Sequence, residues 1–417
     1  MRGIAALLCL LLSGCLAGCV DGRFNVPETP DDEAAYTALF PHYAEYCALS
    51  EISKKPGTAV DIIAGGPGGH SILYLNGVCR VRDAGYPEIA LCPEGSAGDG
   101  VGLSVNAHYA NALWVATEGR ALVFRGGLAP GTPLTAAGYE AAQAAAKAQG
   151  VLDGVVFHPE VFAARLASLS ERDYMYEVSI ATDYAIGFGR DVYCAKVPMS
   201  RAKMAGVVEY LNGLQRPYRS GQTVFRWDVL RNNCAHTTHN ALANVGVWAE
   251  WPVERPLLIS AFDFPVPKNE FVNLMRRTND MPIADPDAIQ ADDAARAALL
   301  TQGWLATRPG GLARAQRAIR PNAMYETDLR LIFYDEPVFA RYQRRFDAIF
   351  ANPRHTDLGA NLRHFQALYG AILAAPARAS TPAPAPAPAN DFGQRLRAHI
   401  ATEQAALDGL IARGTTR

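Results

Sequence analysis

Cys234 directly follows Asn233, and asparagine is a favoured residue immediately before the first turn of a helix. The local pattern therefore predicts a helix that begins at Cys234 and stops at Gly246. A cysteine in the first helical turn lies beside unpaired backbone N–H groups and the positive end of the helix dipole, which favour its thiolate form. The same N–H groups can receive the oxyanion of an acyl intermediate. We therefore predict that Cys234 is a nucleophile; the alternative is a buried helical cysteine without a chemical role.

A thiol nucleophile needs a base, and the nearest histidines are poorly placed to supply it. His236 and His239 follow Cys234 on the same predicted helix, where they point about 200° and 140° away from it around the axis. We expect the base to be His70, which follows the glycine-rich segment 65–69 and opens an apolar run. Glycines there would give a substrate close access to the base. Two histidines three residues apart, without an obvious carboxylate partner, are weak zinc ligands, so we predict no metal and no cofactor.

The dipeptide Asn76-Gly77 stands between two apolar runs, which is typical of a two-residue type I′ turn. A hairpin closed by this turn would place His70 opposite Asp83, with Cβ atoms ~4.5–5.5 Å apart. The carboxylate of Asp83 would then fix the tautomer of the imidazole. Asp83 could instead be a turn or salt-bridge residue, and His108 is its rival for this third role. The predicted set is Cys234 as nucleophile, His70 as base and Asp83 as orienting group.

A histidine at a strand start, a long insertion and then Asn-Cys opening a helix resemble the circularly permuted NlpC-type papain-like families. Lecithin:retinol acyltransferase and several bacterial amidase-like lipoproteins belong to this group. The matching strings are Gly-His-Ser at 69–71 and Asn-Cys-Ala-His at 233–236, within a similarity that spans residues 60–250. The resemblance implies an antiparallel sheet packed against a nucleophile helix. It also implies cleavage or exchange of amides, thioesters or esters through an acyl-cysteine. The acyltransferase has a second histidine as its third polar residue, where we predict Asp83.

The resemblance also bears on Asn233, whose side chain could donate to the oxyanion. Capping the helix is the more ordinary role for an asparagine at this position.

The first residues have the layout of a bacterial secretory signal, with one arginine, the apolar stretch 4–12 and then small residues. This stretch is too short for a membrane-spanning helix, which needs ~20 apolar residues. Residues 16–19 (Leu-Ala-Gly-Cys) resemble a lipobox, in which the cysteine carries the lipid and acyl chains such as palmitate. We therefore expect 1–19 to be a lipoprotein signal peptide with the lipid anchor on Cys19, and 20–30 to be a tether. The alternative is an ordinary signal peptide that contains cysteine.

By resemblance to enterobacterial sorting, Val20 after the anchor favours the periplasmic face of the outer membrane in the bacterial envelope. An exported protein meets oxidising conditions, which allow disulfide bonds. One pairing joins Cys79 with Cys92 and Cys47 with Cys194, and leaves Cys234 free. Connectivity cannot be read from spacing, and the alternative is that all these cysteines are reduced.

The chain of 417 residues is 49% hydrophobic and 19% charged, with a net charge of −2. It lacks the excess of positive charge that is typical of proteins that bind nucleic acid. Its patterns predict an α+β protein. We expect a permuted papain-like domain at 31–255 and a mostly helical C-terminal region at 256–375. A Pro/Ala linker at 376–390 and a C-terminal helix within 391–417 should follow. This last helix could dock on the body or contact a partner.

Together these patterns predict an envelope lipoprotein that acts as a cysteine-dependent hydrolase or acyltransferase. Its expected partners are the membrane, through the lipid, and peptidoglycan peptides, lipids or acylated proteins as substrates. The alternative from another class is a non-catalytic lipoprotein that binds a peptide or lipid in the same cleft. A zinc-dependent hydrolase is a third hypothesis.

Overall fold

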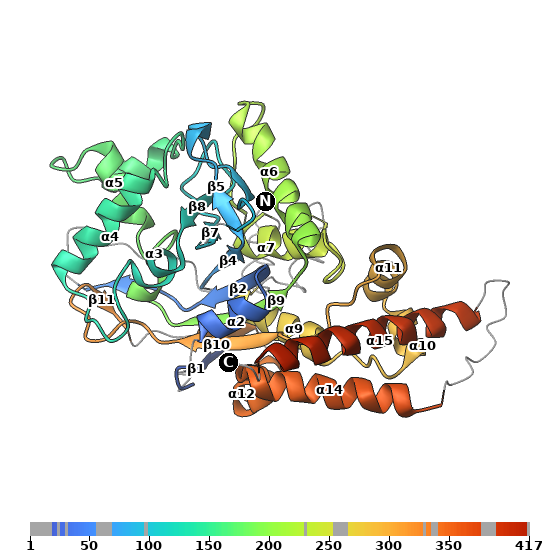
Figure 1. Ribbon diagram of the computed structural model, residues 1–417. Coiled ribbons are helices and arrows are strands. Elements are labelled where there is room, and N and C mark those ends of the chain that lie inside the picture. Colours follow the sequence, from blue (N-terminus) through green and yellow to red (C-terminus); the bar gives the residue numbers. More distant parts are fainter. Residues whose placement is uncertain are drawn as a thin grey trace, which may run out of the picture.

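The computed structural model describes residues 19–22, 26–29, 32–55, 69–95, 99–228, 232–252, 266–327, 331–334, 341–376 and 389–414. The chain has the predicted α+β architecture, with an antiparallel sheet surrounded by helices (Figure 1). The six strands of this sheet lie in the order β10-β9-β2-β4-β7-β8, and every neighbouring pair is antiparallel. Their bounds are β10 (Leu312–Gln316), β9 (Val192–Pro198), β2 (Tyr43–Leu49), β4 (His70–Asn76), β7 (Val101–Ser104) and β8 (Val115–Glu118).

The sheet is covered on both faces, so its central strands are buried along their whole length. Every residue of β2 and β9 is buried, as expected for strands with no face open to water. Helices α7 (Cys234–Ala243) and α9 (Pro267–Asn279) pack against β4 and against β2 and β9, respectively. Alternate residues of β2 enter two separate apolar clusters, one with Tyr46 and the other with Cys47, because neighbouring strand residues point to opposite faces.

The predicted hairpin between residues 70 and 83 is wrong. Strand β4 pairs with β2 on one edge and β7 on the other, so no edge is left for β5 (Val78–Arg80). β5 pairs instead with β6 (Ile89–Leu91) in a separate two-stranded sheet, after a turn at Gly77. Asp83 lies exposed in the 3-10 helix η1 (Arg82–Ala84), away from the register that would oppose it to His70. The Asn-Gly dipeptide predicts only a local turn, whereas β2 and β7 occupy the two edges of β4.

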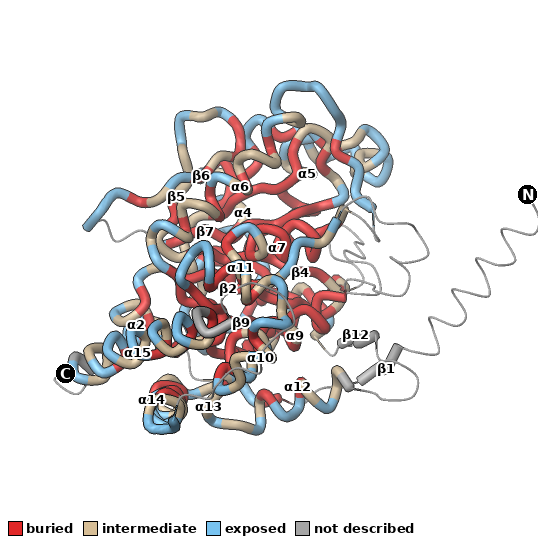
Figure 2. The backbone as a smooth tube through the Cα atoms, turned by 90° about the vertical axis from the view of Figure 1, so that its right-hand side faces the viewer, coloured by how far each residue is buried: buried red, intermediate tan, exposed pale blue. Residues whose placement is uncertain are grey.

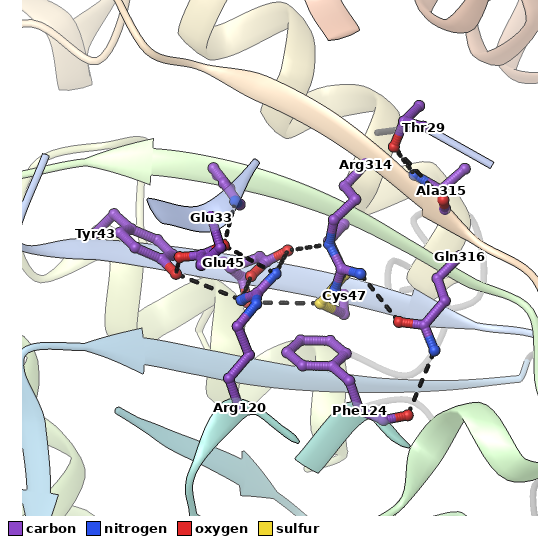
Figure 3. Close-up of a disulfide and its surroundings, with 12 residues drawn as sticks. Thr29, Glu33, Tyr43, Glu45, Cys47, Arg120, Phe124, Arg314, Ala315 and Gln316 are labelled. Atoms are coloured by element: carbon purple, nitrogen blue, oxygen red, sulfur yellow. Dashed lines mark hydrogen bonds and ion pairs between the residues drawn. A yellow bond between two sulfur atoms is a disulfide. The ribbon is translucent and has the colours of Figure 1, made fainter. Parts of the chain in front are cut away.

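The predicted disulfide pairing is confirmed. Cys47 and Cys194 oppose each other in the β2–β9 register and form one bond, and Cys79 and Cys92 form the other. Cys234 is the free cysteine among the residues that the structure describes. The first bond ties two central strands whose cysteines are 147 residues apart in sequence, and its surroundings are shown in Figure 3.

The predicted boundary at residue 255 is not a structural boundary. Strand β10 pairs with β9, and α9 packs on β2 and β9, so the region predicted to be helical completes the main sheet. The C-terminal helix is α15 (Ala389–Gly414), which docks on α14 (Leu358–Ala374). Its buried side chains, Phe392, Leu396, Ile400 and Leu407, share an apolar cluster with Phe365 and Tyr369 of α14. Figure 2 shows α12, α13 and α14 side by side along one edge of the molecule. The predicted linker lies almost wholly outside the described residues.

The remaining elements surround this core. They are α2 (Glu33–Leu39), β3 (Ser53–Lys54), α3 (Arg120–Arg125), α4 (Ala136–Gln149), η2 (Pro159–Ala164), α5 (Glu171–Ser179), η3 (Ile186–Phe188), α6 (Arg201–Arg219), α10 (Pro286–Ala291), α11 (Asp293–Gln302), β11 (Tyr325–Glu326), β12 (Leu331–Tyr334), α12 (Arg341–Ala351) and α13 (Pro353–Thr356).

The predicted signal peptide falls outside the described residues up to position 18. Cys19 begins the short strand β1 (Cys19–Gly22), which pairs with β12, so the predicted tether starts in contact with another strand. Across the described helices, none is both long and apolar enough to cross a bilayer.

Candidate active site

Cys234 is the first residue of α7, as the sequence predicts, and Asn233 caps the helix by accepting a hydrogen bond from the His236 N–H at 3.1 Å. Only 7% of Cys234 is exposed. Its sulfur lies against the hydroxyl and main-chain N–H of Ser71, and against the N–H groups of Cys234 and Ala235. Because Ser71 follows His70 in β4, the nucleophile candidate stands at the start of the strand that carries the base candidate.

The thiol of Cys234 is not held as a thiolate at rest. Burial raises its pKa above the ordinary value, and the surrounding N–H groups and the Ser71 hydroxyl offset this only in part. The sequence predicts the stabilising effect of the helix start correctly, but not the burial that outweighs it. At neutral pH the thiol is therefore protonated, and its reaction requires a base.

His70 is also buried, with 7% of the residue exposed, and its ring is held by a two-step relay. Its Nε2 lies 2.9 Å from the Ser104 Oγ, which in turn lies 2.7 Å from Oδ1 of Asp183. A carboxylate can only accept, so the single hydroxyl proton of Ser104 goes to Asp183. Ser104 must then accept a hydrogen bond from Nε2–H of His70. This tautomer leaves the lone pair on Nδ1, available to accept a proton.

The carboxylate of Asp183 is fixed from its other side, because Asn106 Nδ2 donates to its Oδ2 at 3.0 Å. The relay of Ser104 and Asp183 thus occupies the place that the sequence analysis gave to Asp83. His108, the rival, is an electrostatic neighbour of Asp183, and its Nδ1 is buried without a hydrogen bond in the described part of the chain. The sequence offered no local signal for the relay, because it depends on the β4–β7 pairing.

Arg190 places a buried positive charge in the neighbourhood of both candidate residues. Its guanidinium donates to the Ala181 carbonyl at 2.9 Å and the Ser50 carbonyl at 2.6 Å, and its charge acts on both Cys234 and His70. Burial, with a further contribution from Arg190, lowers the pKa of His70 to about 3. The imidazole is therefore neutral at physiological pH, so the site at rest holds a neutral thiol and a neutral base.

The structure brings Cys234 and His70 to the same end of β4 but does not join them by a hydrogen bond, as judged over the described residues. Such bonds are often long in unliganded enzymes and tighten when substrate binds. The glycine-rich segment lies outside the described residues except for Gly69. A side chain there would clash, since an added Cβ would lie 2.2 Å from the Leu49 carbonyl oxygen and φ is +74°.

His239 is committed to a structural role. Its Nδ1 lies 2.7 Å from Glu270 Oε2 and its Nε2 lies 2.8 Å from the Ala249 carbonyl, so both nitrogens are in hydrogen bonds. The ring is stacked between Trp248 and Trp251, at 4.2 and 3.9 Å between centroids. These contacts pin α7 to α9 and occupy both ring nitrogens, so neither is available to a metal.

Alkylation of Cys234 by iodoacetamide is expected to accelerate continuously as the pH rises through 9, because burial raises the pKa of the thiol above its ordinary value. Peptide mapping of the labelled Cys234 peptide across this pH range measures the rate. Ser71→Ala should slow the reaction further at each pH, since it removes a hydroxyl that favours the thiolate. A rate that is already constant between pH 5 and 8 would instead reveal a resting thiolate–imidazolium pair and contradict this description.

Comparisons with protein families, curated proteins and solved structures return no match for this chain.

Proposed function

We propose that the protein is a cysteine-dependent hydrolase or acyltransferase that acts on amide, thioester or ester bonds. The observation that supports this most is the position of the Cys234 sulfur. It lies at the start of α7, against the main-chain N–H of the residue after His70. The relay through Ser104 and Asp183 leaves Nδ1 of His70 as the proton acceptor.

In the proposed reaction, Nδ1 of His70 takes the thiol proton as the sulfur attacks the carbonyl carbon of the substrate. The carbonyl oxygen becomes an oxyanion that the N–H groups at the start of α7 receive. The imidazolium keeps its Nε2–H bond to Ser104, and the Asp183 carboxylate offsets its new charge. It then gives its proton to the leaving amine, thiol or alcohol. Nδ1 of His70 then takes a proton from water or another acceptor as it attacks the acyl-cysteine. The C–S bond breaks, the acyl group leaves on the acceptor, and the sulfur takes the proton back from His70.

The architecture is in keeping with the resemblance to the permuted papain-like families, since a histidine strand precedes the nucleophile helix and an antiparallel sheet packs against that helix. Within the same proposal, the lipobox at residues 16–19 would deliver the protein to the bacterial envelope, with a lipid on Cys19. We place it at the periplasmic face of the outer membrane. Peptidoglycan peptides, lipids and acylated proteins are the substrate classes that this location offers.

The test uses a thioester of a short acyl chain and the secreted protein that begins at Cys19. Wild type should release the thiol and form an acyl adduct on the Cys234 peptide, detected by mass spectrometry. Cys234→Ala and His70→Gln should each lower turnover by at least about 10³-fold, as for members of other catalytic dyads and triads. His364→Gln, which changes a half-buried histidine on α14, should have no effect and serves as the matched control.

Turnover that survives Cys234→Ala would contradict the proposed role of Cys234 as nucleophile. No turnover by wild type would instead favour a lipoprotein that binds a peptide or lipid without transforming it.

A further inference from the structure

Lys268 carries a buried amine that has no hydrogen-bond partner in the part of the chain that the structure describes. It is the second residue of α9 and is 0% exposed. Its Nζ makes no hydrogen bond to any described residue, and it lies over the Tyr193 ring, 5.8 Å from the centroid. An ammonium group has three donors, and leaving them unpaired in the interior is costly. A buried donor retained at such a cost points to a ligand that supplies the acceptor.

The position of Lys268 connects it to the candidate active site. The carbonyl of its neighbour Pro267 accepts a hydrogen bond from the Tyr46 hydroxyl at 3.1 Å, and Tyr46 is an electrostatic neighbour of Cys234. Arg190 is a second link, because its charge acts on both Cys234 and Lys268. Helices α7 and α9 also pack against each other beside the same sheet (Figure 1). Tyr46 therefore links the start of α9, which carries the amine, to the surroundings of the Cys234 sulfur on the same face of the sheet.

We propose that Lys268 binds a carboxylate of the acyl donor, so that the preferred substrates are acyl groups that carry one carboxylate remote from the scissile carbonyl. This inference rests on the proposed function and names its substrate class. A carboxylate supplies the acceptors that Nζ lacks. The charges around Lys268 limit the ligand to a single negative charge, because Asp191 and Glu51 already act on it alongside Arg190. A phosphate dianion would meet these two carboxylates with twice the repulsion.

Binding of a carboxylate should change the protonation of Lys268, and this change can be measured. Burial lowers the pKa of Lys268 well below its ordinary value. An arriving carboxylate restores the charged form of the amine, since the pair of charges stabilise each other. The Asp191 carboxylate acts on Lys268 without a hydrogen bond to it, and it accepts the Ala318 N–H at 2.9 Å and pairs with Arg317 at 3.2 Å. Binding of a carboxylate to the neutral form of this amine should therefore take up protons from the buffer.

The experiment compares adipoyl and hexanoyl thioesters of the same small thiol, which differ mainly in a terminal carboxylate. Wild type should favour the adipoyl substrate in kcat/KM by about 10- to 100-fold, the value of one charge-assisted hydrogen bond. Lys268→Met should bring the ratio to about one and leave hexanoyl turnover unchanged. Lys203→Met is the matched control, because Lys203 is a partly buried lysine whose amine already bonds the Val245 carbonyl at 2.9 Å.

A ratio that Lys268→Met does not change overturns the inference, and so does an equal loss for both substrates. Folding of the variant is checked by its melting temperature, which should be unchanged or higher, because methionine replaces an unpartnered amine. If no thioester reacts through Cys234, the proposed function fails, and calorimetry with adipate in two buffers of different ionisation heat decides the carboxylate site alone. Proton uptake that is present in Cys234→Ala and absent in Cys234→Ala/Lys268→Met supports the site, and no binding to Cys234→Ala overturns it.

Discussion

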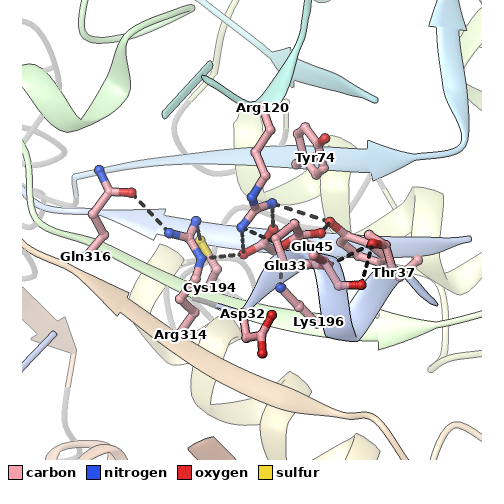
Figure 4. Close-up of polar contacts among 12 residues, drawn as sticks. Asp32, Glu33, Thr37, Glu45, Tyr74, Arg120, Cys194, Lys196, Arg314 and Gln316 are labelled. Atoms are coloured by element: carbon pink, nitrogen blue, oxygen red, sulfur yellow. Dashed lines mark hydrogen bonds and ion pairs between the residues drawn. The ribbon is translucent and has the colours of Figure 1, made fainter. Parts of the chain in front are cut away.

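Glu45→Gln is expected to destabilise the folded protein by about 3–5 kcal/mol, because it removes a buried carboxylate that lies between the guanidinium groups of two arginines. Glu45 is 0% exposed. Its Oε2 accepts a hydrogen bond from Arg120 Nη1 at 2.6 Å, and its Oε1 accepts one from Arg314 Nε at 2.9 Å (Figure 4). Nη2 of Arg314 also lies 3.5 Å from the Cys194 sulfur. The cluster of charged side chains around Glu45 therefore borders the disulfide of Cys47 and Cys194 (Figure 3). Urea unfolding at pH 7 measures the loss.

The same carboxylate should make stability fall in acid. Burial alone would raise the pKa of Glu45, but Arg120, Arg314 and Lys196 outweigh it and lower the pKa to about 2. A carboxylate whose folded-state pKa is depressed stabilises fully above its unfolded value, near 4.5. That contribution is lost as the pH falls from there through about 2. The gap in stability between wild type and Glu45→Gln should therefore shrink between pH 5 and pH 2.

Glu33→Gln is the matched control for this prediction. Glu33 pairs with Lys196 at 2.7 Å and with Arg120 at 3.2 Å, but its side chain is 23% exposed. Water therefore offsets part of the loss, and we expect about 1 kcal/mol. Equal losses for the two variants, or a loss below about 1 kcal/mol for Glu45→Gln, would contradict the argument that burial sets the cost.

Local patterns predicted those parts of the fold that depend on neighbours in sequence. The cap by Asn233 and the start of α7 at Cys234 follow from one dipeptide, and the C-terminal helix follows from apolar spacing. The disulfide of Cys47 and Cys194 was one of the pairings open to the sequence, and the β2–β9 register decides it. The charge cluster around Glu45 could not be foreseen, because its members come from α2, β2, α3, β9 and β10.

In the candidate site, too, local motifs predict some residues and not others. His70 and Cys234 could be selected from their local motifs, whereas the third group required knowledge of which strand lies beside β4. The Asn-Gly turn suggested β5, but β4 pairs with β7, and this pairing brings Ser104 to His70. Asp183 then reaches Ser104 from a distant turn. Long-range pairing decided a role that short-range turn chemistry could not.

Asp183→Asn is expected to lower kcat/KM for the thioester by about 10²- to 10⁴-fold, as carboxylate-to-amide changes do in histidine relays. Asn106 donates to Oδ2 of residue 183, so the carbonyl oxygen of an asparagine there should face Asn106 and its NH₂ should face Ser104. Ser104 would then donate to Nε2 of His70 and hold the proton on Nδ1. This tautomer cannot accept the proton of Cys234. A kcat/KM close to wild type, with folding intact, would refute the relay.

The double variant Asp183→Asn/Asn106→Asp separates the tautomer argument from a simple loss of charge. An aspartate at 106 accepts from the new NH₂, which turns the carbonyl oxygen of residue 183 back toward Ser104. It also keeps the acceptor for the His108 N–H, which Asn106 now bonds at 3.1 Å. Ser104 again donates toward residue 183 and accepts from Nε2 of His70, which frees Nδ1. We therefore expect the second substitution to recover at least about tenfold of the lost kcat/KM. Asn106→Asp alone should lower activity, since it sets two carboxylates against each other. If the losses of kcat/KM from the two substitutions simply add in the double variant, the relay does not act by orienting the proton of Ser104.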